Sequence, residues 1–311
     1  MEFLKALLVS PFADMIGSPL FLAEVVIGGL LTGVMYSLVA LGFVLIFKAS
    51  GVFNFAQGSM VLFAALTLVG LIEHGLPIWL AFIVTLAVMA ALAYGIERWV
   101  LRPLVNQPDI SLFMATIGLS YLIEGIGEMA WGSNVKKLDV GLPDRSFKAG
   151  GILINQLDLS AAVIAGVLVA VLAVFFQRTK LGRALRAVAD DHQAAMSVGI
   201  PLSTIWVIVW FVAGIVALAA GVMWGAKSGV QFSLALIALK ALPVLILGGF
   251  TSVPGAIVGG LIIGVGEKIA EIYWGPISGG AIENWFAYML ALVFLLFRPQ
   301  GLFGERIIER V

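Results

Sequence analysis

Nine long apolar stretches, separated by short polar segments, dominate the amino-acid sequence. An α-helix of about twenty apolar residues crosses the hydrocarbon core of a bilayer, and most of the stretches are close to that length. Hydrophobic residues make up 61% of the chain, above the roughly half that is usual in soluble domains. The sequence therefore predicts an all-α integral membrane protein, a polytopic helical bundle of about 8–10 transmembrane segments in a single domain over residues 1–311. The nine expected spans are residues 22–46, 52–72, 77–97, 110–131, 158–176, 204–225, 234–249, 254–273 and 283–297.

Two of these stretches carry helix-perturbing residues. The seventh is short and contains Pro243, and the eighth is rich in glycine, which leaves open whether one of them is a broken or re-entrant segment. Glycines four residues apart let helix backbones approach closely, so tight packing is the simpler interpretation, with an interface between moving halves or subunits as the alternative. The pairs are Gly29 and Gly33, Gly255 and Gly259, and Gly260 and Gly264.

Arginine and lysine positions indicate the orientation, because short cytoplasmic loops hold the excess of positive charge. If the segment 177–203 is cytoplasmic, Arg145 is the only arginine left outside. Nine crossings then place the two ends of the chain on opposite sides. We expect residues 1–19 to be an amphipathic lead-in on the outer membrane surface and residues 298–311 to be a cytoplasmic tail.

Residues 182–201 form a polar segment between two apolar stretches. Asp190 is a good helix N-cap with Gln193 three residues later, and Gly199 supplies a left-handed stop before Pro201. The pattern predicts a short helix of roughly two turns on the membrane surface. We interpret it as a docking element, with an ordinary solvated connector as the alternative. Its candidate residues are Gly182, Arg183, Arg186, Asp190, Gln193 and Gly199.

Polar side chains are few within the apolar stretches. Ionisable groups in lipid-spanning segments are unfavourable and usually face a cavity or a partner. Lys240 therefore needs a carboxylate partner, for which we expect Glu267 or Glu271. Asn54 and Gln57 either cap the second span or line the mouth of a pathway. Thr116, Ser120, Glu124 and Glu128 recur at spacing four and form a polar stripe on one helix face. The candidates for a translocation path are Asn54, Gln57, Ser120, Glu124, Glu128, Lys240, Glu267 and Glu271.

Composition and motifs exclude several classes of function. The chain has no cysteine, and His74 and His192 belong to no metal-binding motif. A net charge of zero gives no reason to expect nucleic acid as a partner. Walker and hydrolase motifs are missing from the sequence, so we expect no catalytic site, no metal and no cofactor in this chain.

Several short motifs together resemble the permease subunits of bacterial branched-chain amino-acid ABC transporters, specifically the H-type of the two paralogous permeases. The resemblance runs from about Val26 to Gly304. One departure is that the family commonly has Asn-Phe-Ala-His-Gly-Glu where this chain has Gln57 and Ser59. The motifs are Tyr36–Gly42, Asn54–Gly58, Glu97-Arg98 with Arg102-Pro103, Gly182-Arg183 to Gly199-Ile200, Gly248-Gly249 to Pro254-Gly255-Ala256, and Pro299–Gly301.

The resemblance implies an importer in the bacterial cytoplasmic membrane that moves a small polar solute, a branched-chain amino acid or a related amino acid or amide. It implies four kinds of partner: a second permease subunit in a heterodimer, two cytoplasmic ATPase subunits that hold ATP, an external solute-binding protein and the lipid bilayer. The 182–201 segment would be the coupling loop on an ATPase, and Lys240 falls where the family usually has lysine. A self-sufficient carrier or channel, and a membrane scaffold, remain the alternatives.

Overall fold

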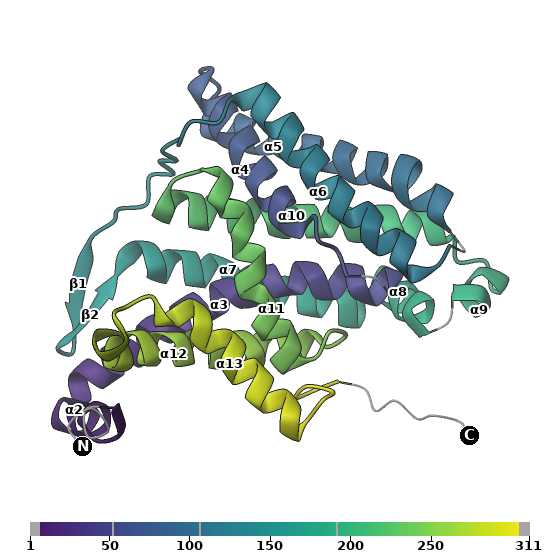
Figure 1. Ribbon diagram of the computed structural model, residues 1–311. Helices are drawn as coiled ribbons and strands as arrows, with labels where there is room; N and C mark the ends of the chain where they lie inside the picture. The colour runs from purple at the N-terminus through teal and green to yellow at the C-terminus, as the bar shows by residue number, and fades with distance from the viewer. Residues whose placement is uncertain (1–6, 52, 106, 191, 305–311) are drawn as a thin grey trace. The chain divides into compact units, whose positions relative to one another are not determined.

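The computed structural model describes residues 7–51, 53–105, 107–190 and 192–304 (Figure 1). These residues are mostly helical, with one two-stranded sheet. The chain divides into two compact units. Unit 1 comprises the described residues of Met1–Ser37, Gly141–Gly166 and Lys240–Val311, and unit 2 comprises Leu38–Val140 and Val167–Leu239.

The nine predicted apolar stretches correspond to nine helical segments, which confirms the prediction of an all-α polytopic membrane protein. Six segments of the described chain are long and apolar enough to cross a membrane. They are α3 (Pro19–Ser50), the run Ile78–Leu104, α6 (Asp109–Trp131), α7 (Gln156–Arg178), α10 (Leu202–Ser228) and α12 (Val253–Ser278). Three are shorter: α4 (Gln57–Glu73), the run Phe232–Gly248 and α13 (Ile282–Phe297).

Of the two segments that the sequence singled out, the seventh changes helix type along its length but is not interrupted. It starts as a 3₁₀ turn, η3 (Phe232–Leu236), and continues as α11 (Ile237–Gly248) with Pro243 inside the helix. The glycine-rich eighth segment is instead one continuous helix, α12. Glycine therefore serves packing in α12 and does not break it.

Unit 1 is organised around close helix contacts of α12. A Cβ added to Gly33 of α3 would lie 2.6 Å from the Gly260 carbonyl oxygen, and one on Gly264 would lie 2.5 Å from the Gly29 oxygen. Such distances leave no room for any side chain. The spacing-four glycines thus bring the two backbones into direct contact, as the sequence predicted.

The other glycine pair of α12 meets α11. A Cβ on Gly255 would lie 2.1 Å from the Gly248 oxygen, and one on Gly259 would lie 2.7 Å from the Val244 oxygen. The chain after α13 also returns to this helix end, where the Leu302 amide donates to the Leu247 oxygen at 2.8 Å. Two motifs that are fifty residues apart, around 248 and around 300, are joined in this way.

Smaller elements complete unit 1. The described part of the lead-in contains α2 (Ser10–Gly17), in which Phe12 and Ile16 are exposed. An antiparallel hairpin of β1 (Ser146–Ala149) and β2 (Ile152–Asn155) precedes α7. Arg306 and Arg310, assigned to the cytoplasmic tail from the sequence, lie outside the described residues.

Unit 2 is built around α4, which is buried on nearly every face. It contacts α5 (Ile78–Gly95), α6, α10 and η3. A helix that is apolar all round belongs inside a protein. Glycine again allows the close approach, since a Cβ on Gly58 would lie 2.1 Å from the Ala235 oxygen.

The end of α5 widens into a π-helix, η1 (Ile96–Leu101), followed by a 3₁₀ turn, η2 (Arg102–Leu104). Glu97 is buried, and Arg102 five residues later donates Nε and Nη2 to its two oxygens at 3.0 and 3.2 Å. The bidentate pair spans this wider turn and neutralises a buried carboxylate. The π-helix was not predicted from the sequence.

Candidate functional site

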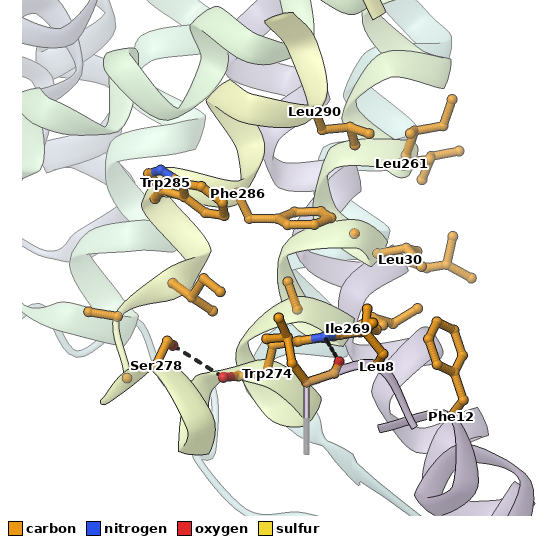
Figure 2. Close-up of a pocket in the computed structure, with 18 residues that line it drawn as sticks. Leu8, Phe12, Leu30, Leu261, Ile269, Trp274, Ser278, Trp285, Phe286 and Leu290 are labelled. Carbon is orange, nitrogen blue, oxygen red and sulfur yellow. Dashed lines mark hydrogen bonds between the residues drawn. The ribbon is translucent and has the colours of Figure 1, made fainter. Parts of the chain in front are cut away.

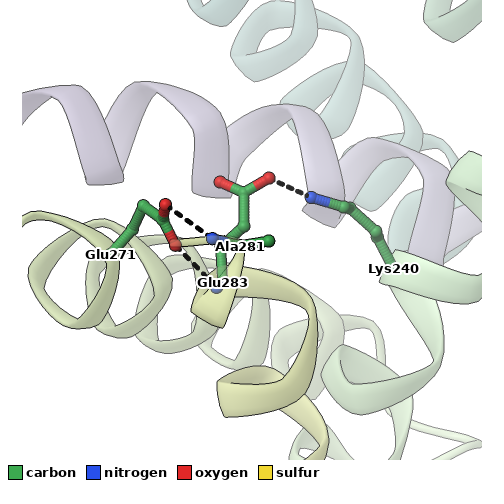
Figure 3. A network of polar contacts seen from close by, with 4 residues as sticks. All are labelled: Lys240, Glu271, Ala281 and Glu283. Carbon is green, nitrogen blue, oxygen red and sulfur yellow. Dashed lines mark hydrogen bonds and ion pairs between the residues drawn. The ribbon is translucent and has the colours of Figure 1, made fainter. Parts of the chain in front are cut away.

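Unit 1 contains an ion pair between helices, Lys240 of α11 with Glu283 of α13 (Figure 3). The Lys240 Nζ and Glu283 Oε1 atoms are 2.9 Å apart, and the side chains are 24% and 32% exposed. The expectation that Lys240 has a carboxylate partner is confirmed. The expected partner was wrong, because Glu283 occupies the place that the sequence gave to Glu267 or Glu271.

Glu271 has a different task, at the start of α13 (Figure 3). Its Oε1 accepts from the Ala281 amide at 3.1 Å and its Oε2 from the Glu283 amide at 3.0 Å. Amides in the first turn of a helix lack partners within the helix, and a carboxylate also suits the positive end of the helix dipole. Glu271 thus anchors the helix end that carries Glu283.

The turn that Glu271 holds has an unusual backbone. Ala281, the N-cap of α13, has a φ of 57°, the single positive value at a non-glycine residue in the described chain. Gly279 and Gly280 before it have φ values of 89° and 87°. A left-handed alanine is unfavourable by roughly 1–2 kcal/mol, so the two Glu271 hydrogen bonds maintain it against that tendency.

Glu267 lies deeper than the other acids of unit 1. It is 2% exposed, and its Oε1 has no hydrogen-bond partner. The carboxylate is hydrogen-bonded to Tyr36 and lies within electrostatic range of both Lys240 and Glu283. The Lys240 Nζ is also 6.0 Å from the centre of the Tyr36 ring. Two oppositely charged groups, an aromatic face and a spare acceptor are therefore gathered in one place.

A second polar group, in unit 2, surrounds the start of α4. Asn54 is fully buried, and its Oδ1 accepts from the Ala56 amide at 3.0 Å. Gln57 is fully buried as well, and its Nε2 donates to the Ala213 oxygen of α10 at 3.4 Å. The Asn54 bond lies in the turn before α4, whose N-cap residue is Ala56 and has no side-chain cap hydrogen bond, so neither predicted alternative for Asn54 is settled.

The Gln57 side chain occupies space that a glycine leaves free. A Cβ added to Gly42 would lie 2.4 Å from the Gln57 Nε2 atom. The Gln57 Oε1 atom is buried without a protein partner. This oxygen could still accept a hydrogen bond from a polar ligand.

The polar stripe of α6 is divided between buried and exposed positions. The Thr116 Oγ1 atom lies 2.8 Å from the Phe113 oxygen and 3.3 Å from the Phe53 oxygen, either of which can accept its hydrogen, and Ser59 donates to Glu124 Oε1 at 2.7 Å. Ser120 donates within its own helix, and Glu128 is exposed. Only Thr116 and Glu124 therefore bind other parts of unit 2 through this stripe.

The polar segment predicted as a single short helix holds two helices, α8 (Lys180–Asp190) and α9 (His192–Ser197). Asp190 is the last residue of α8 and does not begin a helix of its own. The side chains of Asp190 and Gln193 lie outside the described part of the structure, so the predicted capping box does too. Gly199 has a φ of 85°, which confirms the left-handed stop.

Both arginines of this segment bind back to α7. Arg186 donates to the Phe176 and Gln177 oxygens, and Arg183 donates to the Arg178 oxygen at 3.4 Å. Gly182 is required here because a Cβ would lie 2.1 Å from the Phe176 oxygen. The cations thus satisfy the last carbonyls of α7, a role the sequence analysis missed although positive charge favours helix C-termini.

A large apolar groove lies within unit 1, between α2, α12 and α13 (Figure 2). Its volume is about 1230 Å³. Trp274, Trp285 and Phe286 line it, and the Ser278 hydroxyl at its edge already donates to the Trp274 oxygen. The groove offers a polar solute almost nothing to bind. The chemistry of this unit is therefore concentrated at Lys240, Glu267, Glu271 and Glu283.

The described ranges contain no group of three or more histidine, aspartate or glutamate side chains that could hold a metal ion.

Comparisons with known proteins agree on one family. Residues 25–298 match the family described as "Branched-chain amino acid transport system / permease component". The chain is 30% identical, over 92% of its length and 96% of the relative's, to the high-affinity branched-chain amino acid transport system permease protein BraD of Pseudomonas aeruginosa. It is 26% identical to LivH of Escherichia coli strain K12, a permease protein of a system with the same name, over 94% of this chain and 98% of that relative.

More distant similarities extend beyond amino-acid systems. The fructose import permease protein FruF of Bifidobacterium longum is 26% identical over 85% of this chain and 75% of its own. Among solved structures, PsaBC from Streptococcus pneumoniae in complex with Fab aligns with a TM-score of 0.50 and 14% identity, covering 88% of this chain and 91% of that one. This last similarity concerns the fold alone.

Proposed function

Because this chain belongs to the family of permease components of branched-chain amino-acid transport systems, we propose that it forms part of the translocation path of an ATP-driven importer for a branched-chain amino acid or a related small polar solute. The observation that carries the proposal is the family match over residues 25–298 of a multi-pass membrane chain. The bacterial cytoplasmic membrane is the compartment that we propose for it.

Energy has to come from other subunits. The sequence holds no nucleotide-binding or hydrolytic motif, and we propose that the chain is not an enzyme. Two cytoplasmic ATPase subunits, a second permease in a heterodimer and an external solute-binding protein complete the proposed importer. ATP is then bound by the ATPases and not by this chain.

We place the contact with an ATPase on α8 and α9. Arg183 and Arg186 hold α8 to the end of α7, and α9 follows α8 directly along the chain. Leu181, Met196 and Val198 are exposed on this segment, as are Arg183 and Ser197. Apolar side chains with a polar surround are typical of a docking surface.

The test is reconstitution of the chain with its partners in proteoliposomes. We expect uptake of L-leucine to need ATP and the solute-loaded binding protein, and to be lost when this chain is omitted. Uptake by the chain without ATPases would contradict the proposal and would favour a self-sufficient carrier.

The docking role has its own test, Gly199→Val. Valine is strained at a φ of 85°, so the change should displace α9 and reduce solute-stimulated ATP hydrolysis at least several-fold while the complex still assembles. The matched control is Ala194→Val, at an exposed helical position of the same segment. Equal solute-stimulated ATP hydrolysis in both variants would show that α9 is not part of the docking surface.

A further inference from the structure

Unit 1 already contains a binding place for a primary ammonium group, and the Lys240 side chain occupies it. The ammonium is 2.9 Å from the Glu283 Oε1 atom and 6.0 Å from the centre of the Tyr36 ring. A carboxylate and an aromatic face are the groups that proteins use to bind ammonium ions. The same arrangement would suit the ammonium group of a solute.

A second acceptor lies beside this place. The Glu267 Oε1 atom is buried and unpartnered, while its carboxylate is held by Tyr36. Buried polar atoms almost always have a partner, and an ammonium group has three hydrogens to donate. An incoming ammonium group would give Glu267 the partner that it lacks.

We propose that a zwitterionic solute inserts into the Lys240–Glu283 ion pair. The solute's ammonium group donates to Glu283 and to the free oxygen of Glu267, and the solute's carboxylate accepts from the released Lys240. This assignment rests on the proposed function and adds to it a site in this chain that binds both charged groups of the solute.

The charge balance explains the preference for a zwitterion. Inserting a zwitterion gives Lys240 and Glu283 each an opposite charge in exchange for the one it loses, and adds no net charge to the site. A solute with the ammonium group alone separates Lys240 from Glu283 and adds a positive charge, and one with the carboxylate alone separates the same pair and adds a negative charge; uncompensated charge within a membrane protein is strongly unfavourable. A neutral sugar gains nothing by separating the pair. The site would therefore bind a zwitterion in preference to a neutral sugar.

The site is held in place by Glu271. Its two hydrogen bonds to the Ala281 and Glu283 amides position the start of α13, and with it the Glu283 side chain (Figure 3). Pre-organised groups bind a ligand with less loss of freedom. Glu271 is thus a positioning residue for the pair and has no contact with the solute.

The test is saturation-transfer NMR on the full chain in lipid nanodiscs, without the binding protein, which would otherwise select the solute. The probes are L-leucine, leucinol, which lacks the carboxylate, and 4-methylpentanoate, which lacks the ammonium group. We expect binding of L-leucine at least tenfold tighter than either analogue. Equal binding of all three probes would overturn the proposal.

Variants locate the effect. Lys240→Met combined with Glu283→Gln should abolish the preference for L-leucine, and Glu267→Gln, which leaves the ion pair intact, should weaken L-leucine binding several-fold. The matched control is Lys136→Met with Glu73→Gln, which neutralises an ion pair of unit 2. Unchanged binding in Glu267→Gln, or equal loss in the control, overturns the proposal. Leucine transport by the wild-type complex is measured separately, so the importer function can stand or fall independently.

Discussion

The polar side chains within unit 1 and unit 2 find their partners in different ways. Unit 1 uses charges: a Lys240–Glu283 ion pair supported by Glu271 and Glu267. Unit 2 uses mainly neutral groups around α4, with Asn54 and Gln57 bonded to backbone atoms. Amides and hydroxyls that bind backbone fix a local structure, whereas an ion pair can exchange partners with a charged solute. We propose on this basis that the charged groups of unit 1 contact the solute and that the hydrogen bonds of Asn54 and Gln57 in unit 2 mainly support the fold.

Glutamate-to-glutamine substitutions in the two units should differ most in their effect on the KM for L-leucine uptake. Glu283→Gln removes the carboxylate that pairs with Lys240 and that we propose binds the solute's ammonium group, so we expect the KM for L-leucine uptake to rise about tenfold. Glu124→Gln keeps an oxygen that can accept from Ser59, so KM should change by less than about twofold. Uptake kinetics in proteoliposomes measure both. Equal changes in KM in the two variants would contradict the difference proposed between the two units.

Removing the anchor of α13 should cost stability as well. Glu271→Ala leaves the Ala281 and Glu283 amides without their acceptor, and we expect a loss of about 2–3 kcal/mol in the free energy of unfolding. Glu271→Gln retains one acceptor oxygen and should lose less. Denaturation of both variants in detergent measures the difference. If the alanine variant is as stable as wild type, Glu271 does not hold this helix.

A smaller loss is expected in the turn before α4. Asn54→Ala removes the acceptor of the Ala56 amide and should reduce the free energy of unfolding by about 1 kcal/mol. Asn54→Ser can still accept from this amide and serves as the control. The KM for L-leucine should stay unchanged in both variants, and a large rise in KM would place Asn54 at the solute after all.

The substitution with the smallest expected effect should increase the free energy of unfolding and not decrease it. Ala281→Gly relieves a left-handed alanine and should raise the free energy of unfolding by about 0.5–1 kcal/mol. Ala287→Gly, within the same helix, should lower it by about as much. Denaturation curves recorded side by side show the signs. A loss of stability in Ala281→Gly would mean that this turn carries no strain.

The sequence predicts the positions of the helices better than it predicts which side chains pair with one another. Apolar length placed all nine helical segments, and the spacing of Gly29, Gly33, Gly260 and Gly264 predicted a close crossing that the structure contains. The partner of Lys240 was predicted wrongly. That partner depends on the direction in which α13 leaves the turn at 279–281, and three consecutive positive φ values are not encoded in a hydrophobic pattern.

The roles of charged residues at helix ends were also hidden. Arg186 reads as a surface charge in the sequence, yet it bonds to carbonyls ten and nine residues earlier. Glu97 and Arg102 are paired because α5 ends in a π-turn, which apolar periodicity does not indicate. Such contacts depend on how a helix ends, and helix ends are the least certain part of a pattern-based prediction.

The most direct test of the division between the units measures two quantities on two variants: the KM for L-leucine uptake and the melting temperature of the purified complex. For Lys240→Met with Glu283→Gln, the account predicts a rise in KM of about tenfold with a modest change in melting temperature. For Asn54→Ala it predicts a lower melting temperature with unchanged KM. A normal KM in the variant without the ion pair, or a raised KM in Asn54→Ala, would contradict the claim that unit 1 contacts the solute and unit 2 supports the fold.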